Sequence, residues 1–173
     1  PFARFFNFIE LGPFTQEETR EMILRPLDDI PDLTFDEGSI AEIHRLSGGH
    51  PFIVKSISST LYISMNGKGT VTRKSVDGQM LKIVRDLGRK VFSDRFASAS
   101  PEEQKMLIAM AALGLASYTK IAEAAGMPSN RAGILLSRLV GKGLVNRVER
   151  GRYELFHPLF REFIMRIVVT TGQ

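Results

Sequence analysis

The sequence predicts a mainly helical protein, in which a small helical bundle is followed by a helix-turn-helix and a β-hairpin. Apolar residues recur at helical spacing through most of its 173 residues, and this period is typical of amphipathic helices. Residues that favour helix starts stand before these runs, and Gly or Pro stands after them. Strand-like alternation is confined to Leu144–Val148 and Tyr153–Phe156, which a short turn separates.

The first part of the chain predicts two helices of ordinary length. Thr15 and Glu18 have the spacing of a capping box, so one helix should run from there to about Arg25. A second helix is expected from about Asp36 to Leu46, and the glycines that follow should end it.

A third helix should form the buried centre of this bundle. Pro51 suits its first position, where a missing amide hydrogen costs nothing. Its apolar residues cover most of the helix circumference, which predicts burial on nearly all sides. They are Phe52, Ile53, Val54, Ile57, Leu61, Tyr62 and Ile63.

The middle of the chain predicts a turn and a long connecting helix. Residues 66–70 are rich in Gly and should form an exposed turn, and helical spacing then continues through residues 75–96. Ser100 and Glu103 give a second capping box, which starts a helix to about Ala112. We therefore expect a bundle at residues 1–70, a connecting helix at 71–99 and a further domain at 100–173.

A helix-turn-helix is predicted between Lys120 and Lys142. A short helix to Ala125 should close at Gly126, which tolerates the left-handed backbone after a helix end. Ser129 is the expected N-cap of the second helix. Its apolar residues should face the core, and a polar face should point toward water or a ligand. That face consists of Asn130, Arg131, Gly133, Ser137 and Arg138.

The two short strands that follow should form a hairpin. Arg150 and Gly151 provide the turn between them, and Pro158 suits the start of a closing amphipathic helix. A helix-turn-helix with a terminal hairpin is the order of a winged helix. The predicted fold is thus mainly α, with a helical bundle followed by a winged helix that has a two-stranded β-wing.

Charge is distributed unevenly along the chain. Residues 1–66 carry 5 basic and 10 acidic side chains, whereas residues 67–118 carry 9 and 5, and residues 119–157 carry 7 and 3. The basic part is compatible with nucleic acid, and a solubilising surface explains the same distribution.

Composition excludes several classes of site. Cys is absent, which excludes disulfides, thiolate metal ligands and Cys nucleophiles. His44, His50 and His157 share no ligand spacing, so no metal site is expected. No apolar run is long enough for a membrane span and no signal peptide opens the chain, so we expect a cytoplasmic protein without membrane contact.

The chain opens with an aromatic segment, PFARFFNFI. We interpret it as the cut end of a longer protein whose other part covers these rings. A protein-interaction scaffold that uses this segment is one possible function.

DNA binding by the winged helix is another possible function. Asn130, Arg131 and Arg138 would approach a groove of double-stranded DNA, while Arg147, Arg150 and Arg152 of the wing would reach phosphates. Few of these side chains can read bases, so the binding should depend mostly on the DNA backbone and on salt.

Three segments in order resemble a known family. LGPFTQEET, then LSGGHPFIV, then a basic winged helix that ends in FHPLFREFI are similar to the region downstream of the nucleotide-binding core in STAND P-loop ATPases. These belong to the AAA+ group, and the similarity is to its archaeal-type members. The resemblance implies that the bundle is a lid and that a winged helix follows it.

The resemblance also implies a nucleotide site. Gly49, His50 and Pro51 match the GxP motif, whose proline lies against the adenine. His157 matches the histidine of the MHD motif, which contacts the β-phosphate, although Pro158 stands where the motif has Asp. A helix stop at the glycines and a helix start at Pro51 explain the first motif without a ligand.

No Walker A lysine, Walker B acidic pair or catalytic base is present. By the resemblance, ATP or ADP with Mg would be held by an upstream P-loop core of the same protein. This chain by itself should not hydrolyse ATP and should hold no cofactor tightly, and its winged helix would contact DNA or a protein partner.

Overall fold

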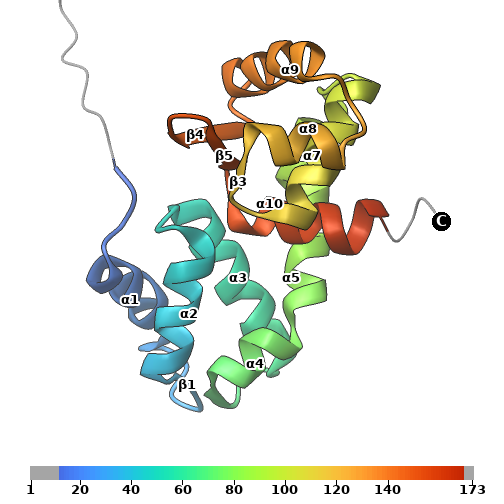
Figure 1. Cartoon of the computed structure of the whole chain (residues 1–173). Helices are drawn as coiled ribbons and strands as arrows, with labels where there is room; N and C mark the ends of the chain where they lie inside the picture. The colour runs from blue at the N-terminus through green and yellow to red at the C-terminus, as the bar shows by residue number, and fades with distance from the viewer. Residues whose placement is uncertain (1–11, 170–173) are drawn as a thin grey trace, which may run out of the picture.

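The computed structural model describes residues 12–169. The fold is mainly helical, as the hydrophobic spacing predicts, and it contains two small sheets, of which the sequence predicts only the hairpin. Figure 1 shows a lower half built from α1 to α4 and an upper half that contains α7, α8, α9 and a hairpin. The aromatic opening segment lies outside the described residues.

The lower half contains α1 (Gln16–Leu24), α2 (Glu37–Ser47) and α3 (Pro51–Ser64), and a 3-10 turn (Arg25–Leu27) follows α1. The predicted Thr15 capping box is present at the start of α1. The three helices pack against one another around a common core.

The expectation that α3 is buried on nearly all sides is wrong. Ile53, Val54, Ile57 and Leu61 are buried, but Phe52, Tyr62 and Ile63 are 46%, 39% and 62% exposed. Phe52 and Tyr62 instead line two separate cavities.

A parallel pair of strands closes the lower half. β1 (Leu33–Phe35) pairs with β2 (Gly69–Val71), with Leu33 opposite Gly69 and Phe35 opposite Val71. The sequence pattern had indicated an exposed turn over part of β2. Each strand has only three residues, so local alternation is too short to reveal strands that tertiary pairing creates.

The predicted connecting helix is present in pieces. It consists of α4 (Arg73–Gly78), α5 (Met80–Leu87), a π-helix (Gly88–Phe92) and α6 (Ser93–Ala97). The break lies at Gln79, whose backbone leaves the helical region with φ −99° and ψ 4°. The predicted apolar face is nevertheless retained, since Val76, Ile83 and Phe92 are buried.

The upper half begins with α7 (Pro101–Leu113), whose predicted Ser100 capping box is present. It continues with α8 (Tyr118–Ala124) and α9 (Ser129–Gly141). The prediction that Ser129 caps α9 is wrong. Pro128 has the extended backbone of the N-cap (ψ 142°), and Ser129 is already helical.

The hairpin strands β4 (Val145–Glu149) and β5 (Arg152–Leu155) form as expected. A third strand, β3 (Ala116–Ser117), adds to β5, so the sheet has three antiparallel strands in the order β3-β5-β4. Two residues carry no period that a sequence pattern can reveal.

The last helix connects the two halves. α10 (Pro158–Phe163) continues as a π-helix (Ile164–Val168) and contacts α2 and α5 below, while the π-helix contacts α7 above. The buried residues of both halves form one continuous hydrophobic cluster. Within residues 12–169, no helix has the length and apolar character needed to cross a membrane.

Candidate functional site

Two His-Pro pairs begin the helices that border a cavity between the halves. His50 and Pro51 start α3, and His157 and Pro158 start α10. All four residues line a cavity of about 700 Å³, which we call the groove. The structure thus brings together residues of the two predicted nucleotide motifs.

The imidazole of His157 is held at both nitrogens. The Leu159 amide donates to Nδ1 at 3.1 Å, so Nδ1 carries no proton. Nε2 therefore carries the hydrogen and donates to the Ser47 carbonyl at 3.1 Å. The ring caps its own helix and joins α10 to the end of α2.

Burial lowers the pKa of His157 below its ordinary value of 6.5. The bond to Ser47 opposes this shift, and nearby His50 and Arg95 add to it. His157 is therefore neutral at pH 7, in agreement with the tautomer that its two hydrogen bonds require.

The start of α3 is less constrained. The exposed side chain of His50 makes no capping hydrogen bond, and the His50 carbonyl accepts from the Ile53 and Val54 amides at 2.9 and 3.0 Å. Pro51 has no amide hydrogen, and within the described part of the chain the Phe52 amide has no hydrogen-bond partner. The amino end of α3 is thus open toward the groove.

Gly49 has a packing role. Its φ is +73°, and a Cβ at this position would lie 2.3 Å from the Phe14 carbonyl oxygen. The Phe14 amide donates to the Gly49 carbonyl at 2.9 Å. Gly48, and not Gly49, lines the groove.

Arg95 is a groove residue that sequence reasoning missed. Its guanidinium carbon lies 4.7 Å from the centroid of the Phe156 ring, a cation-π distance. Residues 89–95 contain three cations, and no local pattern separates Arg95 from its neighbours. Its position over the groove depends on the contact between α6 and the end of the hairpin.

Apart from Ser47, the rest of the groove wall is apolar, and within residues 12–169 no Asp or Glu lines it. Besides the His-Pro pairs and Arg95, the lining residues are Gly12, Pro13, Ser47, Gly48, Phe52, Ile53, Val91, Phe92 and Phe156. Phe156 packs on Phe92 and Phe160, with ring centroids 6.4 and 5.0 Å away. The groove therefore combines a cation, an open helix amino end and flat apolar walls.

The six residues predicted to contact DNA are all exposed and lie on α9 and the hairpin. They do not form one free cationic surface. Arg131 pairs with Glu102 of α7, and Arg152 pairs with Glu149 at 3.0 Å. Arg138, Arg147 and Arg150 make no ion pair with any residue of 12–169.

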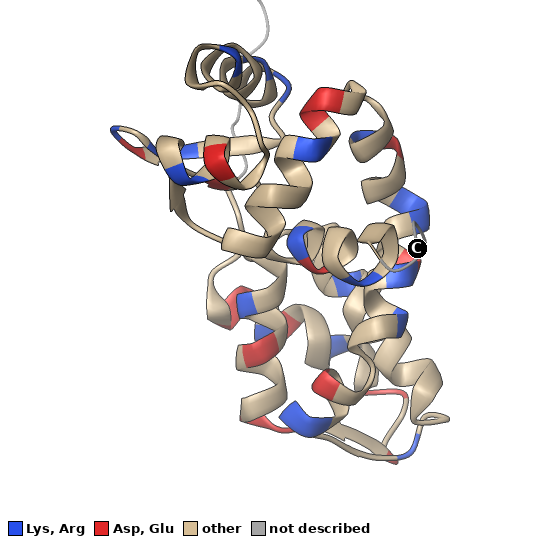
Figure 2. Ribbon diagram, turned by 45° about the vertical axis from the view of Figure 1, so that its right-hand side comes forward, with Lys and Arg blue, Asp and Glu red and all other residues tan. Residues whose placement is uncertain are grey.

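The outer face of α9 is less polar than the sequence pattern indicates. Asn130 uses its side-chain oxygen to accept from the Arg131 amide at 2.8 Å. Ile134 and Val140 are 49% and 38% exposed, although the sequence pattern places Val140 with Leu135, Leu136 and Leu139 on the face toward the core. Figure 2 shows basic residues on α9 and the hairpin, while both halves carry basic and acidic residues.

The three histidines lie in separate environments. His44 Nδ1 is 2.8 Å from the Thr19 hydroxyl, while His50 and His157 border the groove. Within residues 12–169, no three side chains of His, Cys, Asp or Glu are grouped so that they could hold a metal ion.

Together, these observations define a mainly helical protein with two small sheets and a groove lined by Arg95, two His-Pro pairs and aromatic rings. Comparison with known families matches residues 89–164 to a domain of unknown function (DUF8462). The matched segment contains Arg95, Phe156 and His157 but not the Gly49–Pro51 segment. No curated protein matches the chain.

Proposed function

We propose that this chain is the lid and winged-helix region of a STAND-type P-loop ATPase in the AAA+ group. The groove would close over ATP or ADP, which an upstream core would hold with Mg. One observation carries the proposal. The helix start that matches GxP and the histidine that matches MHD border one groove, joined by a hydrogen bond between Ser47 and His157, 110 positions apart in the sequence.

The chemistry of the α3 start supports this function. Pro51 offers a rigid, flat apolar ring, and the half-exposed Phe52 beside it offers a second flat surface. The open amino end of α3 favours a negative group through its unpaired amide and the helix dipole. A nucleotide has the base and the phosphates that these two features suit.

The hydrogen bonds of His157 suggest how nucleotide would change the conformation. Its Nε2 hydrogen now donates to the Ser47 carbonyl. The same hydrogen could donate to a phosphate oxygen only if the Ser47 bond were broken. A nucleotide that accepts this hydrogen would favour an arrangement in which α10 is released from α2, and a ligand shifts such an equilibrium by its difference in affinity for the two states.

The test begins with the coding sequence upstream of Pro1, which should encode a P-loop followed by an acidic Walker B strand. The longer protein should bind ATP or ADP in a calorimetric titration, and Pro51→Ala and His157→Ala should each weaken binding. Residues 1–173 alone should bind nucleotide much more weakly. An upstream sequence without a P-loop would refute the proposal.

A second candidate function is DNA binding. The arrangement of α8, α9 and the β3-β5-β4 sheet supports a winged helix, in which α9 would be the recognition helix. The observation in favour is that Arg138, Arg147 and Arg150 are exposed and free of ion pairs within residues 12–169. The exposed Ile134 in the middle of α9 instead favours a protein contact for that helix.

Fluorescence titration of a duplex DNA at several salt concentrations tests this candidate. Binding should weaken steeply with salt, and replacement of Arg138, Arg147 and Arg150 by Gln should reduce the slope of log K against log salt by about 1 for each arginine that binds a phosphate. Arg85→Gln, on α5, is the matched control. Absence of duplex binding at low salt would exclude the DNA function.

A further inference from the structure

We propose that Arg95 binds the anionic group of the ligand in the groove and that this group is a phosphate or pyrophosphate. The inference rests on the proposed nucleotide function and deepens it, because within residues 12–169 the resemblance assigns a phosphate contact only to His157. Three features of Arg95 support it: a fixed backbone, a guanidinium without an ion pair to any of residues 12–169, and a groove that none of the described Asp or Glu side chains lines.

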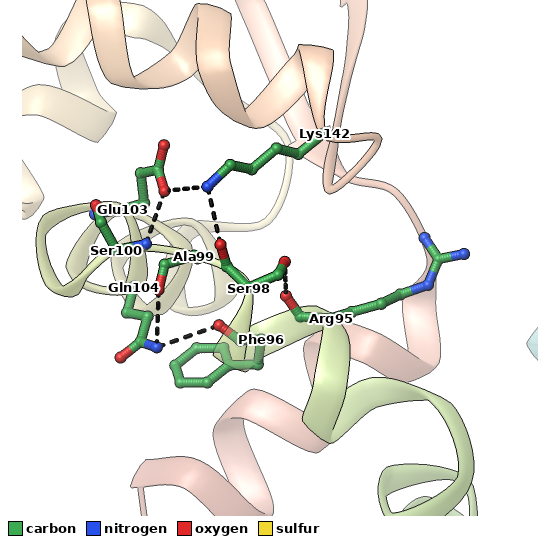
Figure 3. A network of polar contacts seen from close by, with 8 residues as sticks. All are labelled: Arg95, Phe96, Ser98, Ala99, Ser100, Glu103, Gln104 and Lys142. Carbon is green, nitrogen blue, oxygen red and sulfur yellow. Dashed lines mark hydrogen bonds and ion pairs between the residues drawn. The ribbon is translucent and has the colours of Figure 1, made fainter.

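The backbone around Arg95 is held by a polar network at the junction of α6 and α7 (Figure 3). The Ser98 hydroxyl donates to the Arg95 carbonyl at 2.7 Å. Gln104 donates from its amide nitrogen to the carbonyls of Phe96 and Ala99, at 3.2 and 3.1 Å. Arg95 is therefore placed by the start of α7, and not by a loop that is free to move.

Lys142 joins α9 to the same junction. Its Nζ donates to the Ser98 carbonyl at 2.9 Å and to the carboxylate of Glu103 at 2.6 Å. The Glu103 side chain is only 3% exposed. Burial acts to raise the pKa of Glu103, but Lys142 and the Ser100 amide lower it below its ordinary value, so the Glu103 carboxylate is ionised at pH 7. The upper half and Arg95 should consequently move as one unit.

Among the described residues, no carboxylate competes for the side chain of Arg95. Figure 3 shows it extending away from the Lys142 network, and no carboxylate within residues 12–169 pairs with it. Its guanidinium lies over Phe156, whose ring is fixed by Phe92 and Phe160. Stacking on a ring face leaves the N–H groups at the guanidinium edge free to bind an oxyanion in a bidentate manner.

The surroundings favour a polyanion over a carboxylic acid or a neutral ligand. No acidic side chain of the described residues lines the groove, and the open amino end of α3 lies at the same cavity. Arg95 lies on α6, which the polar network ties to the upper half, and α3 belongs to the lower half. An anion that contacts both Arg95 and the amino end of α3 would therefore connect the halves directly. An anion that contacts only His157 would not need to do so.

Titration of the chain with inorganic pyrophosphate, followed by NMR of the arginine side chains, tests the inference. The Arg95 Nε–Hε signal should shift in a saturable way. Arg95→Gln should weaken pyrophosphate binding about tenfold, the reduction expected for one charge-assisted hydrogen bond, and Arg95→Lys should restore it only in part. Arg85→Gln is the matched control, because Arg85 is also exposed and does not line the groove.

A parallel titration with ADP separates this inference from the proposed function. If Arg95→Gln weakens both ligands and Pro51→Ala weakens only ADP, both are supported. If pyrophosphate binds through Arg95 but ADP binds no tighter, the Arg95 anion site is supported, and ADP binding to the longer protein decides the nucleotide function. If ADP binds equally well to Arg95→Gln, or if pyrophosphate does not shift the Arg95 signal, the role of Arg95 is refuted, and the upstream P-loop still decides the proposed function.

Discussion

The two His-Pro pairs that start α3 and α10 have the same local sequence pattern but different structural roles. At α10, His157 is partly buried, caps its helix and bonds to the carbonyl of Ser47. At α3, His50 is exposed and makes no capping bond. Proline takes the first helical position in both, so the dipeptide determines the helix start, and the neighbouring helices determine what the histidine does.

The residues that follow show the same contrast. Phe160 is fully buried and contacts Phe92 and Phe156, whereas Phe52 is 46% exposed at the groove. The α10 start is therefore part of the core between the halves, and the α3 start is available to a ligand. Variants at the two helix starts should therefore differ in their free energy of unfolding, and the difference should be largest when a buried aromatic ring is removed.

Phe160→Ala should lower the free energy of unfolding by about 3–5 kcal/mol, since it removes a fully buried ring from the aromatic cluster. Phe52→Ala should cost less than about 1 kcal/mol because that ring is half exposed. Urea unfolding of both variants, followed by circular dichroism, measures the difference. Equal effects would contradict the assignment of one phenylalanine to the core and the other to the groove.

Gly49→Ala should lower stability by about 2–4 kcal/mol, because the new Cβ meets the Phe14 carbonyl and the backbone has positive φ. Gly48 also has a positive φ, but a Cβ there would have open space around it. Gly48→Ala should therefore lower stability by only about 1 kcal/mol. Thermal melts of the two variants compare these costs. If Gly49→Ala does not lower the thermal stability, the packing against Phe14 does not require glycine at this position.

His157→Ala should cost about 1–3 kcal/mol, since it removes both the helix cap and the bond to Ser47. His50→Ala should change stability by less than about 0.5 kcal/mol. His157→Asn can restore the cap, and should fall between wild type and His157→Ala in a urea titration. If His50→Ala proves as costly as His157→Ala, the contrast between the two helix starts is wrong.

The smallest expected effect is the dependence of the His157 contribution to stability on pH. The pKa of His157 is lowered in the folded state, so the unfolded chain binds its proton more readily. The contribution of His157 should be complete above pH 6.5, the ordinary pKa, and should be lost as the pH falls toward the folded pKa.

Unfolding free energies of wild type and His157→Ala, measured between about pH 5 and 8, isolate this contribution because carboxylates titrate mainly below that window. The difference between the two proteins should shrink with falling pH. A constant difference for His157→Ala would contradict the lowered pKa of His157 in the folded protein.

Local signals in the sequence were sufficient to predict where most of the helices begin. The Thr15–Glu18 and Ser100–Glu103 boxes are present, and Pro51 and Pro158 occupy first helical positions. A cap depends on side chains within one turn of the backbone, so its residues lie together in the sequence. The error at Ser129 is of the same local kind, because the extended backbone of Pro128 places the helix start one residue earlier.

The groove was predictable only in part. The family resemblance selected Pro51 and His157, which do border one cavity, but it also selected Gly49, whose visible role is to pack against Phe14. Arg95 was missed because its contact with Phe156 joins segments about sixty positions apart. The parallel pairing of β1 with β2 was missed for the same reason.

The sequence by itself determined where helices begin and end, which faces are apolar and how charge is divided along the chain, because these properties depend on neighbouring residues. The tertiary structure alone decided which histidine is buried, which phenylalanine is exposed and which arginine lies over the groove. These properties depend on contacts between α2, α6 and α10, and no spacing within a single helix encodes such contacts.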